Sequence, residues 1–472
     1  MPRLLAGFAL AAVLVATGVA RPPLAGAADW PQFRGPQGSG VADDQKPPVK
    51  FGPKDNLRWK VAVPPGASSP VVVGDKVILT AFEGGKLYTI CYSCADGKEL
   101  WRADAKAKKI EPFHPSEGSP AASTPASDGK TVVSYFGSCG LIAYDLDGKE
   151  LWRFELPTAV TNNEFGTGTS PVVSGGLVLL ARDLSKDSAV YAVDLETGSQ
   201  KWKTDRKQQT AYCTPVVWND NGQKVLAVPG MVSLTGYDAE TGKELWVVGK
   251  LPALACATPV LYKDSLIYAA WAPGGADFKL PTFDEILKDA GDEKLGHITK
   301  AGAQKTPFGN FFDNNDPNKD GKITREEWDE LNRILKSGEN RAVALKPGGK
   351  GEVAWSYSKG LPYIPSPVAY RDRLYMLKDG PLLTCLDAKT GKPVYEAERF
   401  KGGARYYSSP VASNGHLYVA SLDGTVAVIE AGGDEPLVAH SVKLGEPIRA
   451  TPAIAHDTLY VRSDKFLYAF GK

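Results

Sequence analysis

The chain has 472 residues, with 55 Lys and Arg against 54 Asp and Glu, and a formal net charge of +1. This balance excludes a strong field of one sign, so we expect no nucleic-acid partner. A chain of this length would ordinarily divide into about three domains, but an internal repeat argues for one closed unit.

Residues 1–27 have the three parts of a secretory signal peptide. Arg3 supplies a positive start, residues 4–20 are apolar, and Ala25-Gly26-Ala27 fits the small-residue cleavage pattern, with Ala20 as a second cleavage candidate. No other stretch approaches the roughly 20 apolar residues of a membrane span. We therefore expect an exported protein, periplasmic or secreted, and an uncleaved anchor is the alternative.

A Ser-Pro or Thr-Pro pair opens each of eight copies of one pattern. The copies follow at roughly 42 to 55 residues, apart from one gap of about 108, and such periods are typical of propeller blades. Because proline cannot donate to a strand ladder, each pair belongs at a strand start beside the central channel. The pairs are Ser69-Pro70, Thr124-Pro125, Ser170-Pro171, Thr214-Pro215, Thr258-Pro259, Ser366-Pro367, Ser409-Pro410 and Thr451-Pro452.

Most copies close on a glycine turn followed by tryptophan. The clearest are residues 143–152, 192–202 and 236–246, and weaker copies end at Trp101 and Tyr395. Glycine between two β runs predicts a hairpin, and one tryptophan per repeat predicts a wedge between adjacent blades.

The two ends of the chain complement each other. A strand with Trp59 precedes the first Ser-Pro pair, and the last repeat ends at residues 467–470 with no tryptophan strand after it. This predicts an all-β, eight-bladed propeller closed by joining the N- and C-terminal strands, which removes exposed sheet edges.

The unit A-x-D-x-x-T-G-x-x-x-W resembles the tryptophan-docking repeat of quinoprotein-like eight-bladed propellers, over residues 56–273 and 341–472. That superfamily includes dehydrogenases that use pyrroloquinoline quinone (PQQ) and the propeller lipoprotein of the outer-membrane β-barrel assembly machinery. Residues 29–36 (DWPQFRGP) resemble the mature start of exported PQQ-like propeller proteins of planctomycete-type bacteria. The resemblance is specific for fold and does not decide function.

Two features separate the chain from these relatives. The dehydrogenases stack PQQ against an adjacent Cys-Cys disulfide, and this chain has no adjacent cysteines. The lipoprotein needs cysteine at the cleavage site, where this chain has Ala27. The resemblance therefore disfavours PQQ and implies no lipid anchor.

Residues 274–340 interrupt the fifth repeat and contain a twelve-residue loop of the EF-hand type. Carboxylate, amide and hydroxyl oxygens stand at the ligand positions, Gly321 stands at the sharp turn, and a helical pattern follows. We predict calcium as the cofactor, with an acidic surface turn as the alternative. The predicted ligands are Asp316, Asn318, Asp320, Lys322 through its carbonyl, Thr324 and Glu327.

A second segment echoes this loop without its ligands. Aligned on Ile298, residues 291–302 have Gly291, Leu295 and Gly302 at positions 1, 5 and 12. We interpret it as a metal-free partner loop, with residues 283–287 in its entering helix.

Six cysteines allow disulfides in an exported chain. Cys213 and Cys256 precede consecutive Thr-Pro pairs, so a bridge between them and two buried thiols are both open. Cys91 and Cys94 are followed by Ala95 rather than histidine, which excludes the c-type haem motif. Cys139 and Cys385 complete the set.

Residues just before the proline openings are candidates for the channel mouth. A mixed ring of these side chains suits a small anion, and solvated loops with no ligand are the alternative. The candidates are His114, Glu117, Asn163, Glu164, Tyr212, Tyr363, Arg405, Tyr406 and Arg449.

Together these features predict an exported, calcium-binding PQQ-like propeller that acts as a non-catalytic binding or scaffolding module for an unidentified protein partner. A PQQ-dependent oxidoreductase of the alcohol or aldose dehydrogenase kind is the alternative. We expect a monomer. The predicted parts are residues 1–27, signal peptide; 28–55, lead segment; 56–273, first part of the propeller; 274–340, EF-hand insertion; and 341–472, second part of the propeller.

Overall fold

The computed structural model of the chain describes residues 29–273, 279–309, 312–316 and 320–472. The predicted signal peptide and the predicted ligand Asn318 lie outside these residues. Across the described ranges, we find no helix with the length and apolar character needed to cross a membrane.

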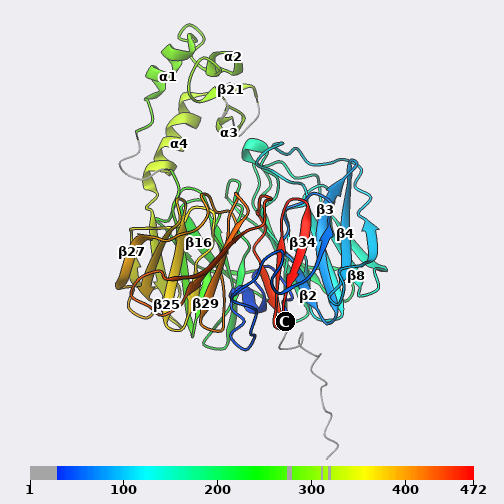
Figure 1. The fold of residues 1–472 in the computed structure, drawn as a ribbon. Helices are drawn as coiled ribbons and strands as arrows, with labels where there is room; N and C mark the ends of the chain where they lie inside the picture. The colour runs from blue at the N-terminus through cyan, green and yellow to red at the C-terminus, as the bar shows by residue number, and fades with distance from the viewer. Residues whose placement is uncertain (1–28, 274–278, 310–311, 317–319) are drawn as a thin grey trace, which may run out of the picture.

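Eight four-stranded antiparallel sheets surround a common axis, so the predicted eight-bladed propeller is confirmed (Figure 1). The blades in chain order have the following strands. Blade 1 contains β2 Val71–Val73, β3 Lys76–Glu83, β4 Lys86–Ser93 and β5 Glu99–Asp104; blade 2 contains β6 Ala126–Ser127, β7 Thr131–Phe136, β8 Gly140–Asp145 and β9 Glu150–Glu155; blade 3 contains β10 Val172–Ser174, β11 Leu177–Arg182, β12 Ala189–Asp194 and β13 Gln200–Asp205; blade 4 contains β14 Val216–Asp220, β15 Gln223–Gly230, β16 Ser233–Asp238 and β17 Glu244–Val248.

The second half of the ring is built in the same way. Blade 5 contains β18 Val260–Tyr262, β19 Ser265–Ala270, β22 Arg341–Leu345 and β23 Val353–Tyr357; blade 6 contains β24 Val368–Tyr370, β25 Arg373–Lys378, β26 Leu382–Asp387 and β27 Pro393–Arg399; blade 7 contains β28 Val411–Ser413, β29 His416–Ala420, β30 Thr425–Glu430 and β31 Val438–Lys443. Blade 8 contains β32 Ala453–Ala455, β33 Thr458–Arg462, β34 Phe466–Phe470 and, as its outer strand, β1 Leu57–Ala62 from the other end of the chain.

A closed ring of hydrogen bonds joins the eight blades around the channel. The opening Ser or Thr hydroxyl of each blade accepts the backbone N–H of the opening residue of the blade before it, at 2.9–3.2 Å. The last bond runs from the Thr451 N–H to the Ser69 hydroxyl. All eight opening residues are buried. The donor and acceptor pairs are Ser69 to Thr124, Thr124 to Ser170, Ser170 to Thr214, Thr214 to Thr258, Thr258 to Ser366, Ser366 to Ser409, Ser409 to Thr451 and Thr451 to Ser69.

Tryptophan side chains wedge between neighbouring blades, as the repeat predicts. The Trp152 indole N–H of blade 2 donates to the Leu195 carbonyl of blade 3 at 2.9 Å. Gly198, in the turn of blade 3, has φ +72°, and a Cβ there would lie 2.7 Å from the Trp152 ring. Glycine is therefore required at this turn both by the backbone and by the tryptophan of the blade before it. Trp59, Trp101, Trp202 and Trp355 make the equivalent hydrogen bonds.

The lead segment crosses the end of the ring opposite the insertion (Figure 1, dark blue). Trp30 forms a bridge with Val72 of blade 1, and Val41 forms one with Ala412 of blade 7. The Arg34 side chain, fully buried, donates to the Pro367 carbonyl of blade 6 at 2.5 Å. Since the segment contacts blades on several sides of the axis, it closes this end of the channel.

The insertion projects from the other end, between β19 and β22 of blade 5 (Figure 1). It contains α1 Phe283–Ala290, β20 Ile298–Thr299, α2 Lys300–Ala303, α3 Phe312–Asn315, β21 Lys322–Ile323 and α4 Arg325–Ser337. Its apolar core is separate from that of the blades and includes Phe283 and Trp328. At its base, the Asn340 side chain donates to and accepts from the backbone of Ala272, and these two bonds hold the two ends of the insertion together.

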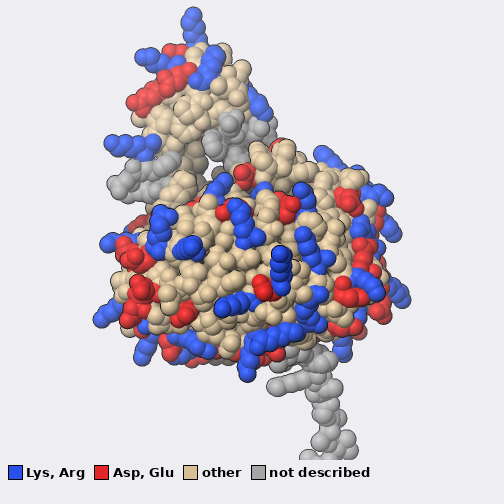
Figure 2. Space-filling view, in the orientation of Figure 1, with Lys and Arg blue, Asp and Glu red and all other residues tan. Residues whose placement is uncertain are grey.

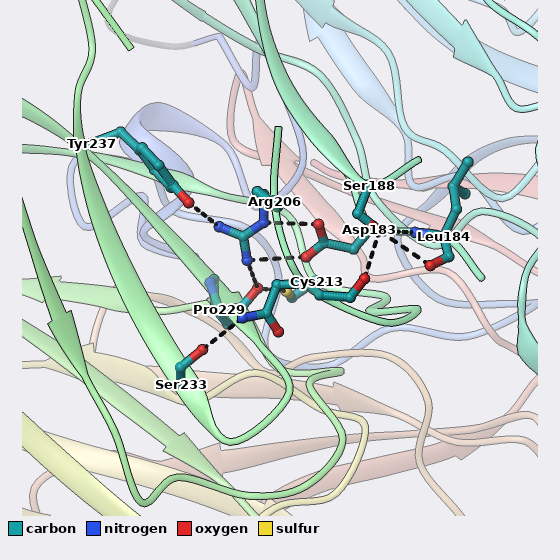
Figure 3. Close-up of polar contacts among 9 residues, drawn as sticks. Asp183, Leu184, Ser188, Arg206, Cys213, Pro229, Ser233 and Tyr237 are labelled. Atoms are coloured by element: carbon teal, nitrogen blue, oxygen red, sulfur yellow. Dashed lines mark hydrogen bonds and ion pairs between the residues drawn. The ribbon is translucent and has the colours of Figure 1, made fainter. Parts of the chain in front are cut away.

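A buried ion pair in blade 3 also contacts blade 4 (Figure 3). The Arg206 guanidinium, which follows β13, donates to both Asp183 carboxylate oxygens, at 2.8 and 3.1 Å. It also donates to the Tyr237 hydroxyl of blade 4 at 2.9 Å. Burial raises the pKa of the Asp183 carboxyl above its ordinary value, and the Arg206 charge offsets part of this effect. The charges are stable here only as a pair.

We predict that Thr124→Val lowers the free energy of unfolding by about 1–3 kcal/mol, because valine keeps the shape of threonine but leaves the buried Ser69 N–H without an acceptor. Thr131→Val, on β7 and outside the ring, should change it by less than about 1 kcal/mol. Chemical denaturation measures both variants. Equal stability of the two would contradict a structural role for the ring.

We predict that Arg206→Met costs about 3–5 kcal/mol of stability, since it leaves the Asp183 carboxylate buried without its counter-charge. Lys201→Met is the matched control, because it removes an exposed ion pair with Asp194 in the same blade. That loss should stay within about 1 kcal/mol. Thermal unfolding of both variants gives the comparison, and a similar loss in the two would refute the assignment.

Candidate functional site

The channel forms a cavity of about 490 Å³, and the loop of Phe165, which lines it, lies on the side of the insertion, where α3 contacts η2. The eight ring residues line its wall, and Phe33 of the lead segment lines its closed end. A cavity of this volume suits a ligand the size of a cofactor or a short peptide segment.

The rim of the cavity has an apolar side and a charged side. Aromatic and aliphatic side chains come from the loops that enter blades 3 to 6, and these residues are Phe165, Tyr212, Leu254, Tyr363 and Ile364. Phe165 and Tyr212 pack with ring centroids 6.0 Å apart, and Trp271 packs edge-on against Tyr363 at 5.5 Å. The charged side comprises Glu117, Asp379, Arg405 and Arg449.

One hydrogen bond crosses the mouth. The Tyr407 hydroxyl, before blade 7, donates to the Glu117 carboxylate, before blade 2, at 2.5 Å. Arg405 donates to the same hydroxyl at 2.9 Å, and the Arg449 guanidinium lies 5.9 Å from the Tyr407 ring centre. Burial, and then the bond to Glu117, raise the pKa of Tyr407 to about 12, so this hydroxyl remains a donor at neutral pH.

Five of the predicted mouth residues line the cavity: Glu117, Tyr212, Tyr363, Arg405 and Arg449. The prediction for Tyr406 was wrong. Its ring is buried against Phe400, and its N–H donates to Asp379, so it belongs to the core. His114 and Glu164 lie on neighbouring exposed loops outside the lining. The side chain of Asn163 lies outside the described part of the structure, so its predicted place at the mouth stays a prediction.

The sequence reasoning missed Tyr407, Asp379, Phe165 and Phe33. Tyr407 is the residue two before the Ser409-Pro410 opening, as Tyr212 is two before Thr214-Pro215. That position was therefore the available signal for Tyr407. Asp379 and Phe33 carry no such signal, because their place depends on contacts between distant segments.

The described residues include all six cysteines, and each is a free thiol. Cys213 and Cys256 are therefore not bridged to each other; the Cys213 thiol is buried, as the second alternative has it, whereas Cys256 is only partly buried. Cys256 lines the channel, and burial raises the pKa of its thiol to about 12. A thiol with this pKa carries almost no thiolate at neutral pH and is a poor nucleophile.

Residues 316 and 320–327 of the predicted calcium loop are described. The Asp316 carboxylate accepts the N–H groups of Asp320 and Gly321 at 3.2 and 2.9 Å. Gly321 has φ +83°, as the sharp turn requires. The Lys322 N–H donates to Asp320 at 3.0 Å.

The end of this loop leads into α4. Thr324 caps the helix, and the Glu327 carboxylate accepts the Thr324 N–H in return, at 2.9 Å. Asp316, Asp320 and Glu327 do not form a three-acid metal group among the described side chains. Carboxylate oxygens are the ligands that calcium prefers, so the residue types fit the ion. The calcium site itself stays a prediction.

The partner loop pairs with the calcium loop where the alignment places it. Ile298 of β20 lies opposite Ile323 of β21, and both stand at position 8 of their loops. In the partner loop, the Asp292 carboxylate accepts the Thr299 N–H and hydroxyl at 2.7 and 2.9 Å. A Cβ at Gly302 would lie 2.0 Å from this carboxylate. Asp292 therefore fills the space that a closing glutamate at position 12 would take.

The insertion leans over the channel mouth. Its helix α3 lies against η2, Asn162–Glu164, in the loop that leads to blade 3 (Figure 1). On the face in Figure 2, Lys and Arg alternate with Asp and Glu, and no large area of one sign appears. The insertion and the channel mouth thus share one end of the molecule.

Comparison with known proteins supports the fold. A family model described as outer membrane protein assembly factor BamB matches residues 89–253 and 338–462, more than half of the chain. No curated protein sequence matches the chain.

Solved structures share the propeller at low identity. BamB from Moraxella catarrhalis has 12% identity and a TM-score of 0.55, covering 88% of this chain and 98% of its own. Quinohemoprotein alcohol dehydrogenase from Comamonas testosteroni has 13% identity and a TM-score of 0.55, covering 94% and 81%. A europium-containing methanol dehydrogenase has 13% identity and the same TM-score, covering 94% and 98%. At these identities the likeness concerns the fold alone.

Proposed function

Because the chain belongs to the family of the outer membrane protein assembly factor BamB, we propose that it is an exported, non-catalytic binding or scaffolding module with one calcium ion in its insertion. The observation that carries the non-catalytic part is the state of the acidic groups in the cavity. Glu117 accepts the Tyr407 hydroxyl, and Asp379 accepts the Tyr406 N–H. These two are the carboxylates among the described lining residues.

A general base must reach the proton that it removes, and a nucleophile must be activated. The described lining residues include no histidine or lysine, Glu117 and Asp379 each accept a hydrogen bond from a protein donor, and burial raises the pKa of the Cys256 thiol. The lining is therefore suited to holding a ligand rather than to transforming one.

The family name supports a protein partner, since an assembly factor acts by contact with other proteins. The end of the propeller that carries the insertion is the best face for this contact. It combines an open cavity, exposed aromatic side chains at Phe165 and Trp271, and the helices of the insertion. The partner itself stays unidentified, and we expect a monomeric chain.

The calcium proposal rests on the loop that precedes α4. The oxygens that would hold the ion come from Asp316, Asn318, Asp320, the Lys322 carbonyl, Thr324 and Glu327. The buried Asp316 already organises the loop backbone, and the paired strands β20 and β21 brace it. Bound calcium would neutralise the acidic loop and tie it to α4.

A PQQ-dependent oxidoreductase is the second candidate, and one observation favours it. Arg405 and Arg449 stand at the rim opposite aromatic rings, which is chemistry that suits a planar anion. The rest of the lining fits the quinone poorly. Below the rim, the described wall contains the ring Ser and Thr residues, small residues, Cys256 and Phe33. The repeat tryptophans lie between blades and not among the lining residues. We therefore derive no step through PQQ.

We predict that Glu327→Gln lowers calcium affinity by more than about tenfold, because one of the two closing carboxylate oxygens becomes a neutral amide group. Glutamine can still accept the Thr324 N–H, so the start of α4 should survive. Isothermal titration calorimetry on the mature chain measures the change.

Glu326→Gln is the matched control, since it removes the same charge one residue earlier and outside the ligand positions. Its calcium affinity should stay within about twofold of the wild type. The melting of the propeller should change little in either variant, because the insertion has its own core. Unchanged calcium binding in Glu327→Gln would overturn the proposed site.

A further inference from the structure

Glu117 and Tyr407 belong to loops on different sides of the channel. Glu117 lies between β5 of blade 1 and β6 of blade 2, and Tyr407 lies between β27 of blade 6 and β28 of blade 7. Blades 7, 8 and 1 separate the two loops around the ring. Their 2.5 Å hydrogen bond therefore spans the mouth of the channel.

The groups around the Glu117 carboxylate form a receptor for an acid. The Tyr407 hydroxyl donates to it, and the Arg405 guanidinium donates to that hydroxyl and so polarises it. Arg449 places a second guanidinium beside the Tyr407 ring, and its Nε also pairs with the Asp464 carboxylate at 3.5 Å. A phenol donor between two guanidinium groups favours a carboxylate, because charge-assisted hydrogen bonds are stronger than neutral ones.

The opposite side of the mouth offers apolar contact. Phe165, Tyr212, Leu254, Tyr363 and Ile364 line the same cavity and are partly accessible. A molecule with an apolar body and one carboxylate would match both sides, whereas Glu117 occupies only the polar side.

We propose that Arg405, Tyr407 and Arg449 form a carboxylate-binding subsite, that Glu117 fills it as an internal ligand, and that an external ligand with a carboxylate on an apolar body displaces Glu117. This inference rests on the proposed binding role of the channel mouth. It does not depend on calcium.

Displacement of Glu117 requires little reorganisation. Its side chain is exposed, so its carboxylate regains water when it leaves. Its loop is held by other contacts, since the Gly118 N–H donates to the His114 carbonyl and the His114 N–H donates to the Glu164 carbonyl. The apparent Kd for an external ligand is then the intrinsic Kd divided by the fraction of molecules in which Glu117 has left the subsite.

The test uses naphthalene-2-carboxylate as a fluorescent probe and its neutral carboxamide as the chemical control, both titrated into the mature chain. Glu117→Ala should bind the carboxylate about tenfold more tightly than the wild type, because the competitor is gone. The carboxamide should gain no more than about twofold. Glu164→Ala is the matched control, since it removes an equal charge from a neighbouring loop outside the lining.

A second variant tests the receptor itself. Adding Tyr407→Phe to Glu117→Ala should reverse the gain, because phenylalanine cannot donate to the carboxylate. The same comparison is made with a short peptide that ends in a free leucine carboxylate and with its C-terminal amide. It shows whether the carboxylate comes from the end of a polypeptide or from a small molecule. A gain with either carboxylate supports the subsite.

Equal affinity of the wild type, Glu117→Ala and Glu164→Ala for both carboxylates would overturn the inference, as would equal gains for acid and amide. Neither result bears on the proposed calcium site, which the calcium titration of Glu327→Gln tests separately. Failure here and failure of the proposed calcium site are thus distinguishable.

Discussion

The structure depends on the closed ring of hydrogen bonds between the opening Ser and Thr residues of the eight blades. Each hydroxyl accepts the N–H of the preceding blade, and the bond from Thr451 to Ser69 closes the circle. The donors are buried, so leaving any of them unpaired would carry the cost of an unsatisfied amide. Proline follows each of these residues and has no N–H to donate. The links between blades at this level therefore join the N–H of one opening residue to the hydroxyl of the next.

The ring also positions the site. Because the opening residues of all eight blades line the channel wall, the residue two places upstream of each also lines the cavity. Tyr212 and Tyr407 both stand two places before a ring residue and both line the cavity. The lead segment closes the opposite end with Phe33, so ligands approach from the side that carries the insertion. Fold and candidate site therefore follow from one repeated contact.

Much of this was accessible from the sequence because the repeat is strong and local. The eight openings and the tryptophan wedges follow from spacing and composition, and α1 lies where the partner loop predicts an entering helix at residues 283–287. Tyr406 was misassigned because adjacent residues of an extended segment point to opposite sides, and Tyr407 rather than Tyr406 faces the channel. The contact between Glu117 and Tyr407 joins residues 290 positions apart, which no local pattern encodes. The role of Asp292 was missed for a related reason. Asp292 stands at position 2 of its loop but fills the space that a glutamate at position 12 would take.

The central claim is that the chain is a non-catalytic module, and equilibrium binding of PQQ to the mature chain in the presence of calcium tests it most directly. Cofactor fluorescence or absorbance follows the titration. Our account predicts no saturable binding of PQQ tighter than about 10 µM, because the described lining residues include no tryptophan that could serve as a stacking floor. Saturable one-to-one binding tighter than about 10 µM would contradict it and would restore the oxidoreductase as the leading function.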